Sequence, residues 1–274
     1  GDGYDDVIVG APEFDIDEDK YDGRAEVFYG SSTGLSSDPD WTEDSDQIFA
    51  AFGISVGSAG DMDGDGYDDV VIGAHTYDNG ETNEGRAFVY LGDETGLSDS
   101  PDWTAESNQA TAYFGISVGA AGDVNGDGCA DVIVGAYSYD NGETNEGRAF
   151  VYHGCATDLT AIPDWTAESD QPNAGFGNSV GTAGDVNGDG YADVIIGASG
   201  YDNGQEDEGR AFVYHGSSTG LSTSLGWTAE SDQEGAYFGN SVGTAGDVNG
   251  DGYADVIVGA LMYDNGIPDV GRAY

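Results

Sequence analysis

The sequence has 274 residues, of which 53 are acidic and only 6 are lysine or arginine, so its formal net charge is −47. A surface of this charge repels phosphate backbones and anionic membranes, which excludes nucleic acid as a partner. No window approaches the roughly 18 consecutive apolar residues of a membrane helix, so we expect no direct membrane insertion. The 47 glycines predict short strands joined by tight turns.

The sequence repeats itself at a fixed interval. Phe-Gly pairs begin at Phe52, Phe114, Phe176 and Phe238, which are 62 residues apart. Trp-Thr pairs and Gly-Arg-Ala triplets recur at the same interval. Such self-similarity is typical of repeat architectures, so we expect residues 1–274 to form a single repeat domain. Because the sequence opens and stops within a motif, we also expect it to be a fragment at both ends.

One repeat, beginning at Phe114, predicts four strands. Residues 114–118 alternate in polarity and suit a short inner strand. Residues 131–136 form a continuous β-branched run, which is typical of a strand buried on both faces. Residues 147–152 form a third strand, and residues 165–166 lie near a fourth, outermost one.

Four strands per period and no helical periodicity predict an all-β fold, a β-propeller of four-stranded antiparallel blades. A β-solenoid is the alternative, but its repeats are usually shorter. The first blade lacks its first strand and the last blade lacks its fourth, so the sequence supplies about four and a half to five blades. We expect five blade-like units in an open arc that forms part of a larger ring.

Every repeat carries an acidic loop with the pattern Asp-x-Asp/Asn-x-Asp-Gly-x-x-Asp. Oxygen ligands at loop positions 1, 3, 5 and 9, with a backbone carbonyl at position 7, can wrap a hard cation of the size of Ca²⁺. Glycines at positions 4 and 6 let the chain curl around the ion. The pattern therefore predicts one Ca²⁺ per loop and at least four sites.

The predicted ligands fall in four complete loops and one truncated loop. They are Asp61, Asp63, Asp65, Tyr67 and Asp69; Asp123, Asn125, Asp127, Cys129 and Asp131; Asp185, Asn187, Asp189, Tyr191 and Asp193; Asp247, Asn249, Asp251, Tyr253 and Asp255; and, in the truncated first loop, Asp2, Tyr4 and Asp6. The tyrosines and the cysteine hold position 7 and would contribute their backbone carbonyl oxygens.

Two other interpretations of the acidic loops are weaker. An EF-hand needs a bidentate Glu at position 12, which here is Ile72, Val134, Ile196 or Val258. A solvated Asp-Gly turn would explain one loop, but four complete copies that keep the ligand positions favour metal binding. A halophilic or marine environment is an alternative source of the remaining scattered acidic residues.

Three segments resemble the FG-GAP repeat family, whose units build the propellers of integrin α-subunits and occur in many secreted microbial proteins. They are residues 114–118, 247–260 and 147–152, and the same motifs recur along essentially the whole chain. The resemblance implies a β-propeller that holds Ca²⁺ in hairpin loops at one rim and lies outside the cell. It also implies that a ligand or partner binds the opposite face or the rim. Integrin propellers have seven blades, so this chain would form part of a seven-bladed ring.

The remaining residues favour recognition over catalysis. His75, His153 and His215 occupy places that hold other residues in other repeats, so no unique constellation suggests an enzyme. The Arg of each Gly-Arg-Ala triplet is expected to pair with a nearby acidic loop rather than to bind a ligand. The repeated Trp is expected to fill the groove between blades.

We therefore expect an extracellular, secreted or cell-surface calcium-binding module that serves adhesion, ligand recognition or surface assembly. Its partner would be a protein or glycan at the cell surface, with a larger assembly possible. One alternative is a multivalent carbohydrate-binding propeller that uses the Trp and Tyr rings. Another is an accessory domain of a larger secreted enzyme.

The two cysteines are predicted to form a disulfide. Cys129 replaces the Tyr of the other loops, and Cys155 lies in the same repeat beyond the third strand. Pairing Ala136 with Arg148 across the hairpin places positions 129 and 155 opposite each other, just beyond its open end. A Cα separation of roughly 5.5 Å there suits a disulfide. Such a bond also favours an oxidising compartment.

Overall fold

The computed structural model describes residues 3–15, 22–155 and 159–274. Within these ranges every regular element is a β-strand. No helix that could span a membrane occurs in this part of the chain. The predicted all-β class is therefore confirmed.

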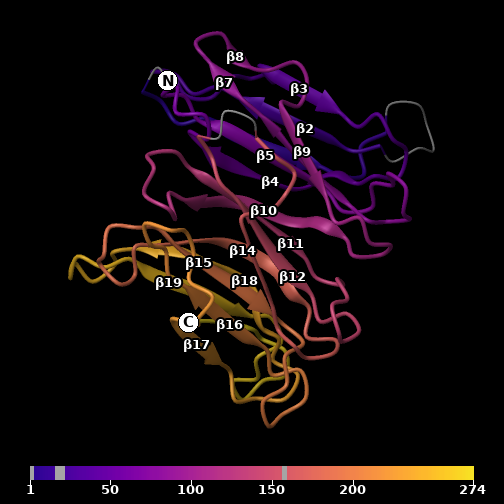
Figure 1. Ribbon diagram of the computed structural model, residues 1–274, viewed down its shortest axis with the longest axis vertical. Coiled ribbons are helices and arrows are strands. Elements are labelled where there is room, and N and C mark those ends of the chain that lie inside the picture. The colour runs from indigo at the N-terminus through magenta and orange to yellow at the C-terminus, as the bar shows by residue number, and fades with distance from the viewer. Residues whose placement is uncertain (1–2, 16–21, 156–158) are drawn as a thin grey trace.

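The strands form five antiparallel sheets that follow one another along the chain, from the indigo N-terminal sheet to the yellow C-terminal sheet in Figure 1. The first sheet contains β1 (Val7–Ala11), β2 (Arg24–Phe28) and β3 (Trp41–Asp44). The second contains β4 (Phe52–Gly60), β5 (Asp69–Ala74), β6 (Arg86–Tyr90) and β9 (Trp103–Glu106), while β7 (Gly92–Asp93) and β8 (Gly96–Leu97) form a small ribbon. The third contains β10 (Phe114–Gly122), β11 (Asp131–Ala136), β12 (Arg148–Tyr152) and β13 (Trp165–Glu168). The fourth contains β14 (Phe176–Gly184), β15 (Asp193–Ala198), β16 (Arg210–Tyr214) and β17 (Trp227–Glu230). The fifth contains β18 (Phe238–Gly246), β19 (Asp255–Ala260) and β20 (Arg272–Ala273).

These sheets are the predicted propeller blades. The three central sheets have four strands each, paired in chain order. In the described residues the first sheet has no inner strand and the last has no outer strand, as the repeat pattern predicts. The inner strand is longer than expected, because β10 continues past Val118 to Gly122 at the edge of the acidic loop. Bulges on both sides of its central segment, at Phe114/Ser117 and at Ala120/Gly122, let it stay paired with β11 over that length.

The hydrophobic core lies between neighbouring sheets. Between the second and third sheets, Trp103 packs in one cluster with Phe114, Val134 and Tyr152. The strand at 131–136 is buried along its whole length, which explains its uninterrupted apolar sequence. Each blade therefore depends on its neighbours to cover its faces.

The Phe-Gly motif explains how closely the sheets approach. Gly115 has a φ of +83°, and a Cβ atom at Gly73 would lie 1.9 Å from the Gly115 carbonyl oxygen. A side chain at Gly73 therefore cannot be accommodated, and Gly115 occupies a conformation that other residues rarely adopt. An isolated bridge from Gly85 to Phe114 also joins the second sheet to the third.

The outer faces of the two terminal sheets are uncovered. Val9 is 44% exposed and Ile257 is 47% exposed, although Ile72 and Ile195 at the equivalent places are fully buried. The described residues therefore form an open arc, in agreement with the sequence-based expectation.

Candidate metal centres

The loop between β4 and β5 brings three carboxylates together. One oxygen each from Asp61, Asp63 and Asp65 lies within 4.8 Å of the other two. The backbone of the same loop holds them, since Asp61 Oδ1 accepts a hydrogen bond from the Gly64 N–H (2.8 Å) and Oδ2 accepts one from the Gly66 N–H (3.0 Å). These contacts turn the side chain at position 1 toward the inside of the loop.

The other three complete loops repeat this arrangement with Asn at position 3. In the loop at 123–131, the Gly126 and Gly128 N–H groups donate to the Asp123 carboxylate, and the Asp127 N–H donates to Asn125 Oδ1. Position 4 has a φ between +75° and +79° in all four loops, so only glycine fits without strain. The loops at 185–193 and 247–255 keep the same hydrogen bonds.

In three of the four complete loops, the carboxylate at position 9 connects the loop to the hairpin after the third strand of the same blade. Asp69 is 1% exposed and accepts hydrogen bonds from the N–H groups of Met62 (2.7 Å) and Gly92 (2.8 Å). Burial raises its pKa to about 6, and it does the same for Asp131. The N–H donor from the hairpin after the third strand is not among the residues predicted from the sequence. The recurrence of Gly30, Gly92, Gly154 and Gly216 at that place was the available signal.

The donor set fits a hard cation. Three carboxylate oxygens converge in the loop at 61–69, and the other three complete loops carry Asp and Asn at the same positions. No sulfur or imidazole is among the predicted side-chain ligands. In the first complete loop, Asp61, Asp63, Asp65 and Asp69 would hold the ion together with the carbonyl of Tyr67. A bound Ca²⁺ would supply the positive charge that these clustered carboxylates lack.

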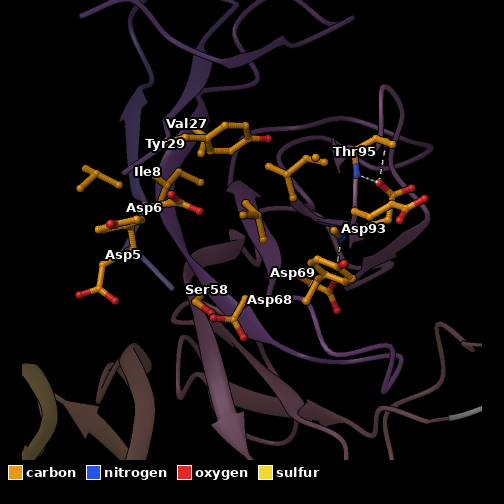
Figure 2. Close-up of a pocket in the computed structure, with 18 of the residues that line it drawn as sticks. Asp5, Asp6, Ile8, Val27, Tyr29, Ser58, Asp68, Asp69, Asp93 and Thr95 are labelled. Carbon is orange, nitrogen blue, oxygen red and sulfur yellow. Dashed lines mark hydrogen bonds between the residues drawn. The ribbon is translucent and has the colours of Figure 1, made fainter. Parts of the chain in front are cut away.

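The truncated first loop is described only in part. Asp2 lies outside the described residues, while Asp6 Oδ1 accepts a hydrogen bond from the Gly30 N–H at 2.8 Å, as the position-9 residue does elsewhere. Figure 2 shows the groove beside it, which Asp5, Asp6, Asp68 and Asp69 line together with residues of the hairpin at 92–97. In the described residues the first sheet lacks the inner strand that the four following sheets have.

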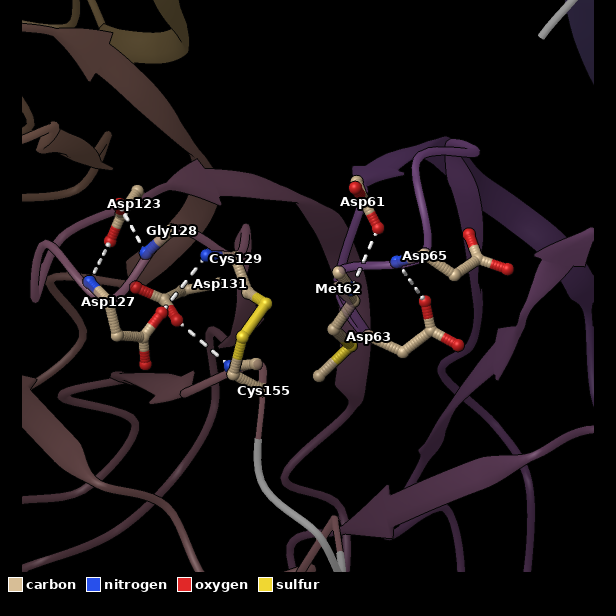
Figure 3. Close-up of a disulfide and its surroundings, with 12 residues drawn as sticks. Asp61, Met62, Asp63, Asp65, Asp123, Asp127, Gly128, Cys129, Asp131 and Cys155 are labelled. Atoms are coloured by element: carbon tan, nitrogen blue, oxygen red, sulfur yellow. Dashed lines mark hydrogen bonds between the residues drawn. A yellow bond between two sulfur atoms is a disulfide. The ribbon is translucent and has the colours of Figure 1, made fainter.

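The structure contains the predicted disulfide between Cys129 and Cys155, whose Cα atoms are 5.5 Å apart. Figure 3 shows the bond between its own acidic loop and the loop that carries Asp61, Asp63 and Asp65. The Cys155 N–H donates to the Met62 carbonyl at 2.8 Å, which links the two blades directly. The bond therefore lies at a contact between blades as well as within one.

Comparison with known proteins identifies the repeats. The FG-GAP repeat family matches residues 52–90, 114–152, 176–214 and 238–274, each of which spans an inner strand, an acidic loop and the two strands that follow. The chain belongs to the FG-GAP repeat family.

Several curated relatives of the FG-GAP chain are integrin α-subunits. Integrin alpha-4 of Xenopus laevis is 32% identical over 221 residues, which cover 78% of this chain and 20% of that protein. Integrin alpha-PS2 of Drosophila melanogaster is 32% identical over 255 residues, or 84% of this chain and 17% of that protein. Integrin alpha-7 of Rattus norvegicus is 34% identical over 184 residues, which cover 65% of this chain and 15% of that protein. The chain thus spans a fifth or less of the length of these relatives.

Four of the five arginines of the Gly-Arg-Ala triplets have acidic partners in the described residues, but these partners do not lie in the acidic loops. Arg148 lies 3.7 Å from Glu168 on the neighbouring outer strand, and its guanidinium stacks over the Tyr139 ring at 5.3 Å. Arg24 makes a two-point contact with Asp44 at 2.6 and 2.8 Å. The prediction that each Arg pairs with an acidic loop is therefore wrong about the partner. The strand register places the outer strand, and not the loop, next to the Arg.

Three of the four tryptophans fill the grooves between FG-GAP blades, as expected, whereas Trp227 in the last described groove is 44% exposed. Trp103 is 4% exposed, and its Nε1–H donates to the Thr160 carbonyl of the following repeat at 3.0 Å. Trp41 and Trp165 are buried in the same way and make the equivalent bonds. These three buried indoles cannot stack on a sugar, so they do not support a carbohydrate site in every repeat.

Proposed function

We propose that this chain is a calcium-binding propeller module that acts in adhesion, ligand recognition or surface assembly outside the cell, and that it has no catalytic role. Membership of the FG-GAP family and similarity to integrin α-subunits support the recognition role. No site built from unique catalytic residues competes with this proposal in the described part of the chain. Its partner is proposed to be a protein at the cell surface.

The observation that carries the calcium proposal is the convergence of carboxylate oxygens in the loop at 61–69. Asp61, Asp63 and Asp65 lie within 4.8 Å of one another, which costs electrostatic free energy unless a cation is present. The same donor pattern recurs in the three following repeats. Ca²⁺ suits it better than Mg²⁺ because it accepts more oxygen ligands in a less rigid arrangement.

The extracellular location rests on two observations of different kinds. The chain contains the Cys129–Cys155 disulfide, and disulfides form and persist in oxidising compartments. Sites that depend on ambient calcium are also better supplied outside the cell. Residues 1–274 are proposed to be one repeat domain within a larger ring, since further blades would cover the exposed Val9 and Ile257.

The test is calorimetric titration of metal-stripped protein with Ca²⁺ and then with Mg²⁺, together with thermal unfolding in Ca²⁺ and in EGTA. An ion that binds only the folded state stabilises it by about 2.7 kcal/mol per site at 100-fold excess over Kd. We therefore expect EGTA to lower the Tm by many degrees. An unchanged Tm in protein shown to be free of metal would refute the calcium proposal.

Matched variants separate ion binding from the effect of total charge. The loop variant replaces Asp65, Asp127, Asp189 and Asp251 with Asn, which removes one position-5 carboxylate per loop. The control variant replaces the exposed Glu81, Glu143, Glu206 and Glu234 with Gln and changes the charge equally. We expect the loop variant to lose most of the calcium-dependent rise in Tm and the control to keep it.

A further inference from the structure

Consecutive acidic loops are joined by backbone hydrogen bonds. The Ala130 N–H, at position 8 of one loop, donates to the carbonyl of Asp61, at position 1 of the loop before it (2.9 Å). The same bond joins Ala192 to Asp123 at 3.0 Å and Ala254 to Asp185 at 2.9 Å. Each bond connects a residue next to the position-9 carboxylate of one loop to the position-1 residue of its neighbour.

The side chain at position 7 makes a second connection. A Cβ atom at Gly126 would lie 2.5 Å from Tyr191 Cε1, and one at Gly188 would lie 2.5 Å from Tyr253 Cε1. Each Tyr ring therefore covers the position-4 glycine of the preceding loop. That glycine follows the position-3 ligand directly and shapes the loop around the ion site.

The disulfide takes the place of the Tyr ring at one contact. A Cβ atom at Gly64 would lie 2.9 Å from Cys129 Sγ and 3.6 Å from Cys155 Sγ. In the last loop no following blade is described, and nothing lies within 4 Å of a Cβ atom at Gly250. The side chain that covers a position-4 glycine thus belongs to the next loop along the chain, and the contact depends on the conformation of that loop.

We propose that neighbouring calcium loops bind their ions with positive cooperativity along the arc. This inference rests on the proposed calcium function. In an empty loop the carboxylates repel one another, so the residues at positions 7 and 8 are held less rigidly. Their contacts then stabilise the preceding loop less well. By thermodynamic linkage the coupling is reciprocal, so either ion raises the affinity for the other by the same factor.

Electrostatics alone predicts the opposite sign. A bound dication makes the neighbouring site less attractive to a second one, although salt at about 0.15 M screens charges beyond roughly 8 Å. The Asp189→Asn variant separates the two effects. In this variant the loop at 185–193 is empty and keeps two carboxylates, so its net charge is about −2, whereas the wild-type loop with three carboxylates and a bound dication carries about −1. Electrostatics alone would therefore make the neighbouring sites of the variant bind Ca²⁺ more tightly, while loss of cooperativity would make them bind it less tightly.

The experiment is hydrogen exchange measured by mass spectrometry, with peptides covering each loop, as free Ca²⁺ is raised at about 0.15 M salt. In Asp189→Asn we expect the calcium midpoints of loops 123–131 and 247–255 to rise by about 5-fold or more. Loop 61–69, which does not contact loop 185–193, should shift less. Glu234→Gln, an exposed charge change outside the loops, should shift none of them.

Unchanged or lower midpoints in the two neighbouring loops would overturn the cooperativity while leaving calcium binding intact. If no loop of the wild-type protein gained protection with Ca²⁺, both the cooperativity and the calcium function would fall.

A second pair of variants tests the contact without removing a carboxylate. Tyr253→Ala uncovers Gly188 and leaves every predicted oxygen ligand in place, so we expect a higher calcium midpoint for loop 185–193. Tyr67→Ala is the control, because Tyr67 covers no glycine of a complete loop. Equal effects of the two variants on loop 185–193 would show that the ring contact carries no coupling.

Discussion

The indole of Trp165 meets the ring of Tyr214 edge-on across the junction of the third and fourth sheets, with ring centroids 4.9 Å apart and planes at 69°. The pair joins the outer strand of one blade to the third strand of the next. Trp41 with Tyr90 and Trp103 with Tyr152 form the same contact. Aromatic packing between blades thus recurs along the arc at the period of the sequence repeat.

Removing one of these indoles should weaken the fold. We expect Trp165→Ala to lower the free energy of unfolding by about 3–5 kcal/mol, because a buried aromatic side chain leaves a cavity and an unpaired Ser222 carbonyl. Trp227→Ala is the matched control, since Trp227 is 44% exposed at the equivalent place. Denaturant unfolding should show less than half the effect in the control. Equal losses would mean that contact between blades is not the source of the stability.

A second prediction separates backbone strain from packing at loop position 4. Gly126 and Gly250 have φ values of +76° and +77°, but only Gly126 faces a neighbouring ring. Alanine at either site should cost about 1–2 kcal/mol for the left-handed conformation. Gly126→Ala should cost more because Tyr191 must also move. Equal Tm changes for the two variants would contradict the close contact.

The third prediction concerns pH. The buried carboxyls of Asp69 and Asp131 have pKa values raised to about 6, above the value of about 3.9 expected in the unfolded chain. The folded state therefore binds more protons between these values, and its stability falls as pH rises through 6. In EGTA we expect a higher Tm at about pH 5.5 than at about pH 7.5.

Saturating Ca²⁺ should reverse this dependence, because protons and the ion compete for the same carboxylates. The Asp69→Asn/Asp131→Asn double variant serves as a control and should show a smaller pH effect in EGTA. A Tm in EGTA that rises steadily with pH in the wild type would contradict the raised pKa values.

The fourth prediction concerns the disulfide. Replacing both Cys129 and Cys155 with Ser should lower stability by about 2–4 kcal/mol, since the bond closes a loop with a sequence separation of 26 residues. Cys129→Tyr with Cys155→Ser restores the residue types of the fourth repeat, Tyr191 and Ser217, and should recover part of the loss. Thiol labelling of denatured, unreduced protein should find no free cysteine. Two labelled thiols would show that the bond does not form in solution.

Much of the blade was predictable because its determinants are local and repeated. The β-branched run at 131–136 forms a strand with the expected bounds, because the neighbouring blades cover both faces of its sheet and apolar side chains are needed on both. The inner strand was predicted too short, because its later residues, such as Gly119 and Gly122, have low intrinsic strand preference. Pairing with β11 outweighs that preference.

The repeat, the all-β class, the oxygen-donor pattern of the loops and the cysteine pairing could be predicted from the sequence, because each depends on residue type at a regular spacing. The contacts between residues of neighbouring blades could be found only in the folded structure. Tyr191 covers Gly126 and not its own loop, and Arg148 pairs with a strand residue, Glu168, and not with a loop. These contacts depend on how one sheet packs against the next. That geometry follows from many weak packing interactions, which no single motif encodes.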